Sequence, residues 1–133
     1  MKKGARQEDV QRSAAEVRIL VDRINAVYGP VVDLREFDKS APPTLKQRVG
    51  LWLATDVFVS TAVGEGLNLI PLEFMYVRGN KDAEAGALII SEFSAGASVL
   101  NGAIRVNCYD IASIAKAMDE TARMVRFFCS LLD

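Results

Sequence analysis

One stretch of the sequence combines residues that could bind an anionic ligand carrying hydroxyl groups. Gly64 and Gly66 precede Asn68, which lies at the predicted start of a helix, and Glu73 follows one turn later. Glycine allows positive φ and a close approach of a ligand to the backbone. The free amides at a helix N-terminus favour an anion. This stretch therefore predicts an anion site at the two amides that follow Asn68.

Glu73 fits such a site only in one role. Its carboxylate would repel a phosphate, but it could accept hydrogen bonds from a ribose diol, as acidic residues do in dinucleotide-binding folds. A purely structural interpretation uses the same residues, because Asn68 would cap the helix and Glu73 would suit its dipole. Pro71 fits a first helical turn under either interpretation. The spacing alone leaves both open.

A second candidate loop spans residues 91–97, which read SEFSAGA. Its small side chains would let a sugar or a phosphate approach the backbone. A tight turn between a strand and a helix explains them equally well. The spacing leaves these two interpretations open as well.

Hydrophobic periodicity predicts the elements that must position these loops. An amphipathic helix is expected over residues 9–28, with Asp9 as its cap and Gly29-Pro30 as its end. The other predicted helices are 44–54, 68–78 and one beginning after Asp110, and the predicted strands are 31–37, 57–60, 87–91 and 103–106. Continuous apolar strands alternating with helices indicate an α/β fold, with a mostly parallel sheet covered on both faces. Ligands of such sheets lie beyond the carboxyl ends of the strands, so loops 60–68, 91–97 and 107–110 are the candidates.

Composition excludes several classes of function. The chain has 133 residues, which is the size of one domain, and a formal net charge of −1. Without a basic surplus, no nucleic-acid partner is expected. No apolar run reaches the length of about 18 residues expected of a membrane span. The N-terminus lacks the apolar core of a signal peptide, so no membrane association is expected.

Residue counts and motifs exclude further mechanisms. The chain contains no histidine, so Ser-His-Asp and Cys-His catalysis and His-ligated zinc are excluded within it. Cys108 and Cys129 follow no metal or redox spacing and are expected to be reduced thiols. Because neither Gly-x-Gly-x-x-Gly nor a Gly-Lys-Ser/Thr loop is present, a dinucleotide dehydrogenase or an NTPase is not expected.

Four ordered segments resemble the trehalose-6-phosphate synthases, glycosyltransferase family 20. The family motif Asp-Gly-Met-Asn-Leu-x-x-x-Glu corresponds to residues 65–73, which read EGLNLIPLE. The strand and loop Leu-Ser-Glu-Phe-x-Gly and the segment Ala-Ile-x-Val-Asn-Pro-Tyr/Trp correspond to IISEFSAG at 89–96 and AIRVNCY at 103–109. The helix at 9–29, ending RINAVYG, matches a fourth segment, so the resemblance runs from about Arg6 to Met124.

The resemblance implies a partial C-terminal, Rossmann-like domain of a GT-B enzyme. Such an enzyme transfers glucose with retention from UDP-glucose to glucose 6-phosphate in the cytoplasm, without a metal or other cofactor. By resemblance, Glu73 would accept from the ribose hydroxyls and the Leu69 and Ile70 amides would hold the diphosphate. The resemblance also implies that four residues contact the donor glucose: Glu65, Gly66, Leu67 and Asn68. Pro43 would contact the uracil. Arg6 would contact the acceptor phosphate, although it lies one residue off the family's register.

Several departures from the family pattern bear on activity. Gly64-Glu65 replaces the family's Arg-Asp, and Cys108 replaces its proline. The resemblance divides the chain into a partial UDP-sugar-binding domain at 1–124 and a divergent apolar tail at 125–133. It implies that the strand with the family's arginine and lysine, and the whole N-terminal acceptor domain with the catalytic histidine, lie outside this sequence.

These departures give three expectations for the isolated chain. It contains no catalytic residue and should not turn over alone, and its unpaired sheet edge should cause low stability or self-association. The alternative function is a non-catalytic module that binds UDP-sugar or regulates a partner chain. A flavodoxin-like or sugar-phosphate-sensing domain would require the motif matches to be accidental.

Overall fold

The computed structural model of the chain describes residues 3–37, 40–64, 66–79 and 86–130, with side chains over the same ranges except at 3–7, 128 and 129. The chain divides into two compact units, Met1–Pro42 and Pro43–Asp133. The first holds one long helix and the segment after it. The second holds all three described strands and the remaining helices. The sheet and its loops therefore belong to the second unit.

Helix α1 (Lys3–Tyr28) dominates the first unit. It includes the predicted helix 9–28, but it begins at least one turn earlier, so the prediction that Asp9 caps it is wrong. Asp9 is instead an exposed residue inside the helix. The predicted end is confirmed, because Gly29 follows the last helical residue with φ of 81°. This left-handed conformation favours glycine and is typical of the residue after a helix.

The strand predicted over residues 31–37 is wrong. This segment is irregular and pairs with no strand among the described residues. Asn25 satisfies its first backbone groups: Oδ1 accepts from the amides of Val31 at 3.0 Å and Val32 at 2.9 Å, and Nδ2 donates to the Val32 carbonyl oxygen at 2.9 Å. Arg18 of α1 also forms an ion pair with Glu36. The β-branched residues predicted a strand, but the Asn25 side chain binds the backbone groups of Val31 and Val32 that a sheet would use.

The second unit is built on a three-stranded sheet in the order β1-β2-β3, and its strands are parallel, as the sequence predicted. The strands are β1 (Val57–Ser60), β2 (Ala87–Ser91) and β3 (Ile104–Val106). Ser60 pairs with Ile90, and Ser91 pairs with Val106. Strand β2 is central, and its residues from Leu88 to Ser91 are all buried. The strands therefore leave the sheet at one common carboxyl edge.

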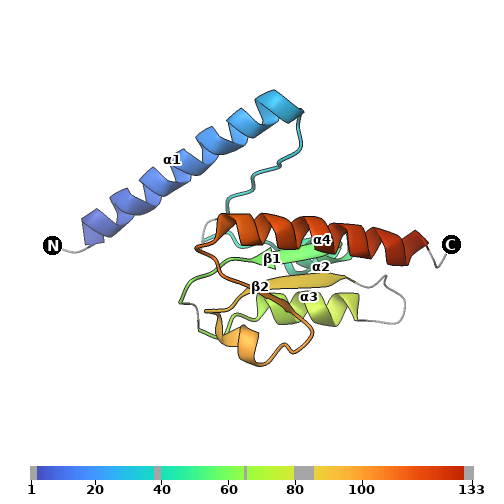
Figure 1. Cartoon of the computed structure of the whole chain (residues 1–133). Coiled ribbons are helices and arrows are strands. Elements are labelled where there is room, and N and C mark those ends of the chain that lie inside the picture. Colours follow the sequence, from blue (N-terminus) through green and yellow to red (C-terminus); the bar gives the residue numbers. More distant parts are fainter. Residues whose placement is uncertain (1–2, 38–39, 65, 80–85, 131–133) are drawn as a thin grey trace. The chain divides into compact units, whose positions relative to one another are not determined.

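Helices α2 (Leu45–Leu53), α3 (Ile70–Arg78) and α4 (Ile111–Ser130) accompany the sheet. Figure 1 shows α4 along one side of the strands and α3 along the other. Trp52, Phe74 and Leu88 form the buried core on the α3 side. Phe58 of β1 stacks on Phe74 with ring centroids 5.3 Å apart, and Trp52 meets both rings edge-on. This aromatic cluster holds α2 and α3 to the sheet.

Local signals explain where these helices begin. Thr44 forms a capping box with Gln47, whose backbone amide and side chain bond to Thr44. Asp110 caps α4 by accepting from the Ser113 amide at 3.0 Å, as predicted. Helix α3 begins at Ile70, two residues later than predicted, and residues 95–98 form the 3-10 turn η1 (Ala95–Ser98). Helix α4 continues through Met124 to Ser130 without interruption.

Candidate functional site

The candidate site lies at the carboxyl edge of the parallel sheet, where the predicted loops leave it. The loop after β1 runs to the start of α3, and the loop after β2 runs into η1. The Glu92 amide donates to the Val106 carbonyl oxygen at 3.0 Å, so the ends of β2 and β3 remain linked beyond the sheet. The segment 107–110 then leads into α4. All three candidate loops therefore emerge from one edge.

The loop after β1 is open around its glycines. Gly64 has φ of 75°, which lies in the left-handed region, and a Cβ at Gly64 or Gly66 would meet no atom within 4 Å. Leu67 and Leu69 are exposed. Glu65, which the resemblance places against the donor sugar, lies outside the described residues. The backbone of this loop is thus accessible to a ligand on both sides of residue 65.

Asn68 lies one residue before Leu69, the N-cap residue of α3, and its side chain bonds to the first helical residue. Its Oδ1 accepts from the Ile70 amide at 2.9 Å. Pro71 occupies the first turn and is buried. The Ile70 amide, one of the two expected to hold a diphosphate, is therefore already satisfied by Asn68 in this structure. A phosphate oxygen at Ile70 would have to replace the Asn68 carbonyl oxygen.

Glu73 lies in the first turn of α3, and its carboxylate pairs with an arginine that the sequence analysis did not single out. Arg48 Nη2 donates to Glu73 Oε1 at 3.2 Å. The two side chains are partly exposed, at 31% for Arg48 and 36% for Glu73. Arg48 comes from α2, 25 positions earlier. Only the packing of α2 on α3 brings the two together, so no local spacing could have indicated the pair.

The far ends of the same two helices are joined by a second arginine. Arg78, which is buried, donates from Nη1 to the Leu53 carbonyl oxygen at 2.9 Å and lies 3.5 Å from the Asp56 carboxylate. Helices α2 and α3 are thus tied at both ends. The Arg48–Glu73 tie lies at the start of α3, beside the candidate site, and the Arg78 tie lies away from it.

The loop after β2 is a tight turn and also presents an aromatic ring. Ser94 caps η1 by accepting from the Gly96 amide at 3.2 Å. Ser91 Oγ accepts from the Phe93 amide at 3.2 Å. Phe93 contacts Tyr109 of the next loop edge-on, with ring centroids 5.6 Å apart, and both rings are exposed. These hydrogen bonds account for the two serines of the loop. The ligand role of this loop stays a prediction.

The remaining predicted site residues lie apart from Glu73 in the chain. Pro43 directly precedes the Thr44 cap of α2 and is half-buried. Arg6 belongs to α1 in the first unit, and its side chain is not among those described. Cys108, the residue in place of the family's proline, is a free, half-buried thiol after β3.

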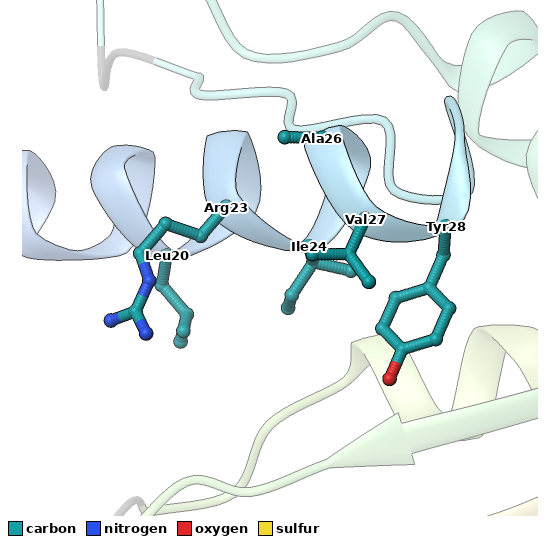
Figure 2. Close-up of a pocket in the computed structure, with 6 residues that line it drawn as sticks. All are labelled: Leu20, Arg23, Ile24, Ala26, Val27 and Tyr28. Atoms are coloured by element: carbon teal, nitrogen blue, oxygen red, sulfur yellow. The ribbon is translucent and has the colours of Figure 1, made fainter.

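A shallow hollow lies along the end of α1, far from the candidate site in sequence. Its lining comes from α1 alone: Leu20, Arg23, Ile24, Ala26, Val27 and Tyr28. Figure 2 shows Leu20, Ile24 and Tyr28 projecting from one side of the helix and Ala26 from the opposite side. This hollow contains a single charged side chain, that of Arg23.

The described residues contain neither a membrane-spanning helix nor a cluster of metal-ligating side chains. None of the described helices has the length and apolar character needed to cross a membrane. Within the same residues, no three Cys, Asp or Glu side chains gather in a way that would hold a metal ion.

Comparison with known proteins gives a consistent result. The model of glycosyltransferase family 20 matches residues 1–127. The chain is 33% identical over 131 residues to alpha,alpha-trehalose-phosphate synthase (UDP-forming) 5 of Arabidopsis thaliana. That match covers 86% of this chain and 15% of the Arabidopsis protein.

Two solved structures resemble the fold. The trehalose-6-phosphate synthase OtsA superposes with a TM-score of 0.71 at 26% identity, covering 88% of this chain and 25% of that one. The N-terminal domain of the Candida albicans trehalose-6-phosphate phosphatase gives a TM-score of 0.68 at 27% identity, covering 84% of this chain and 23% of that one. The chain thus spans a quarter or less of the length of each of these three relatives.

Proposed function

This chain belongs to glycosyltransferase family 20, and from that premise we propose that it forms the UDP-binding half-site of a retaining trehalose-6-phosphate synthase. The reaction proposed for the whole enzyme is glucosyl transfer from UDP-glucose to glucose 6-phosphate. In this proposal the chain binds the nucleotide part of the donor. Apart from Arg6, the groups that act on the acceptor would come from the part of the relatives that this chain does not match.

The position of Glu73 carries the proposal. Its carboxylate lies in the first turn of α3, directly after an open glycine-containing loop that follows β1. The side chain is 36% exposed, so a ligand hydroxyl can reach it. A carboxylate accepts hydrogen bonds and donates none when ionised, which suits the two hydroxyls of a ribose. Glu73 is therefore assigned to the ribose.

The N-terminal end of α3 suits the diphosphate. Backbone amides and the helix dipole favour negative charge there. In this proposal the Leu69 and Ile70 amides hold the diphosphate, with Ile70 exchanging its bond to Asn68 for one to a phosphate oxygen. Stabilising the charge of the departing UDP in this way is the chain's contribution to the chemistry.

The other contacts are assigned from the family motifs. Gly66, Leu67 and Asn68 would present backbone to the donor glucose, with Glu65 at its hydroxyls. The backbone around Pro43 would meet the uracil, and Arg6 would meet the acceptor phosphate.

A second candidate function is a non-catalytic module that binds UDP-sugar or regulates a partner chain. Two observations favour it. Gly64-Glu65 stands where the family motif has Arg-Asp, which removes a positive charge from the site. A domain of similar fold also forms the N-terminal part of a protein named as a phosphatase. Because the isolated chain is expected not to turn over under either function, the two are separated by a turnover assay of an enzyme in which this chain is joined to an acceptor domain of the family.

Calorimetric titration of the chain with UDP tests the proposal. We expect binding in the micromolar-to-millimolar range that Glu73→Gln weakens, while Glu120→Gln, which changes an exposed glutamate of α4, leaves it unchanged. A folded chain that releases no heat with UDP would refute the half-site. Binding that Glu73→Gln leaves intact would refute the role of Glu73.

A further inference from the structure

The Arg48–Glu73 pair lies at the edge of the candidate site rather than in the core that holds the helices together. Trp52 packs on Phe74 across α2 and α3 with ring centroids 6.2 Å apart. The buried Arg78 ties the far ends of the same helices. These two contacts join α2 to α3 independently of Arg48. The pair at the other end therefore invites a role beyond helix packing.

The geometry of the pair engages half of the carboxylate. The contact is a single one, from Arg48 Nη2 to Glu73 Oε1 at 3.2 Å, rather than the two-pronged arrangement that arginine often forms. Within the described part of the chain, no donor contacts Glu73 Oε2. One carboxylate oxygen is thus held while the other is left for a hydroxyl donor.

Arg48 is also a costly residue at this position. Its Nε is buried and has no hydrogen-bond partner among the described residues. A buried donor left unpaired destabilises a folded protein, so an apolar side chain would serve packing better. Local features that cost stability are commonly found at functional sites. Packing alone therefore does not explain an arginine at this position.

Charge gives Arg48 a second reason to lie beside Glu73. The N-terminal end of α3 is where the proposed diphosphate binds, and an uncompensated carboxylate one turn away would repel it. A guanidinium keeps its charge at any physiological pH. Arg48 therefore offsets the charge of Glu73 while it orients the carboxylate.

From these observations we propose that Arg48 is a positioning residue for nucleotide recognition. It holds Glu73 Oε1 so that Oε2 faces the ribose hydroxyls, and it compensates the carboxylate beside the diphosphate. The proposal rests on the proposed function, because it assumes that Glu73 accepts from a ribose. It adds a residue from α2 that does not itself touch the ribose.

The test compares two nucleotides, UDP and its 2′,3′-dideoxy analogue, by calorimetric titration of the 133-residue chain. We expect the native chain to bind UDP about tenfold more tightly than the analogue, since each 1.4 kcal/mol of lost hydrogen bonding is tenfold in affinity. In Arg48→Gln this preference should fall to about twofold or less, and in Arg48→Lys it should be intermediate. Arg123→Gln, at an exposed arginine of α4, should keep the full preference.

The preference ratio separates positioning from a general structural role. A loss of stability would weaken the binding of both nucleotides and leave the ratio of their affinities unchanged. If Arg48→Gln does not fold, Arg48→Lys supplies the ratio. A native preference that both variants keep would overturn the positioning role and leave the proposed function standing. A folded native chain that binds neither nucleotide, or binds both equally, would overturn the role of Glu73 and the inference with it.

Discussion

Arg78 Nη1 donates to the Leu53 carbonyl oxygen at 2.9 Å, so the end of α3 closes the end of α2. The side chain of Arg78 is only 5% exposed. Removing one partner from a buried hydrogen bond leaves the other unsatisfied, which costs more than the bond itself contributes. This contact is therefore a structural tie of the second unit.

We expect Arg78→Met to lower the free energy of unfolding by about 2–3 kcal/mol, because it leaves the Leu53 carbonyl without its charged donor. Urea denaturation followed by circular dichroism measures the change. Arg123→Met, at an arginine whose side chain is 78% exposed, should change it by less than about 0.5 kcal/mol. Equal midpoints for the two variants would contradict the structural role of Arg78.

Replacing each of two glycines by alanine should change the free energy of unfolding in opposite directions. Gly50 lies inside α2, and a Cβ there would meet nothing within 4 Å. Gly50→Ala should therefore stabilise the chain by about 0.5–1 kcal/mol, which is the usual difference in helix propensity. A Cβ at Gly86 would lie 2.8 Å from Phe74 Cζ and 2.9 Å from Arg78 Nε, so Gly86→Ala should destabilise the chain. Thermal melts of the two variants give the comparison, and shifts of the same sign would show that one of these two environments is misassigned.

Glu73→Ala should weaken binding of UDP by about 1–3 kcal/mol, the cost of leaving the ribose hydroxyls of the bound nucleotide without their acceptor. The same substitution also leaves Arg48 without its carboxylate. Titration of the native chain and the variant with UDP, and of both with uracil alone as a ligand without ribose, checks the assignment. An unchanged UDP affinity would leave Glu73 as a residue of the helix only.

Self-association should be measurable in the isolated chain. Strands β1 and β3 form the two edges of the described sheet, and an unpaired strand edge is a template for pairing with another chain. We expect the sedimentation coefficient to rise with protein concentration. A monomer at every concentration, together with a sharp cooperative melt, would count against this expectation.

Much of the second unit could be predicted from the sequence because its signals are local. Apolar runs indicated all three strands, and Asp110 indicated the start of α4. The segment at 31–37 was misjudged because the amides of Val31 and Val32 bond to Asn25, and a strand propensity does not show where such bonds will go. The hydrogen bonds from Asn25 of α1 outweighed the strand propensity of this segment.

The candidate site was predictable only in part for a similar reason. The glycine loop and Glu73 lie close together in sequence, so their spacing was compatible with a ligand site as well as with a helix cap, and the family motif favoured the ligand site. Arg48 lies 25 positions earlier on another helix, and no periodicity links it to Glu73. Pairs of this kind depend on how two helices pack, which emerges only with the fold.

The aromatic cluster gives the second unit an intrinsic fluorescent probe. The sequence contains a single tryptophan, Trp52, which is 7% exposed and packs against Phe58 and Phe74. Its indole emission therefore reports on the second unit alone, and exposure to water on unfolding should shift that emission to longer wavelengths. Circular dichroism records α1 as well. A difference between the two transition curves would show that the two units unfold separately, without any label attached to the chain.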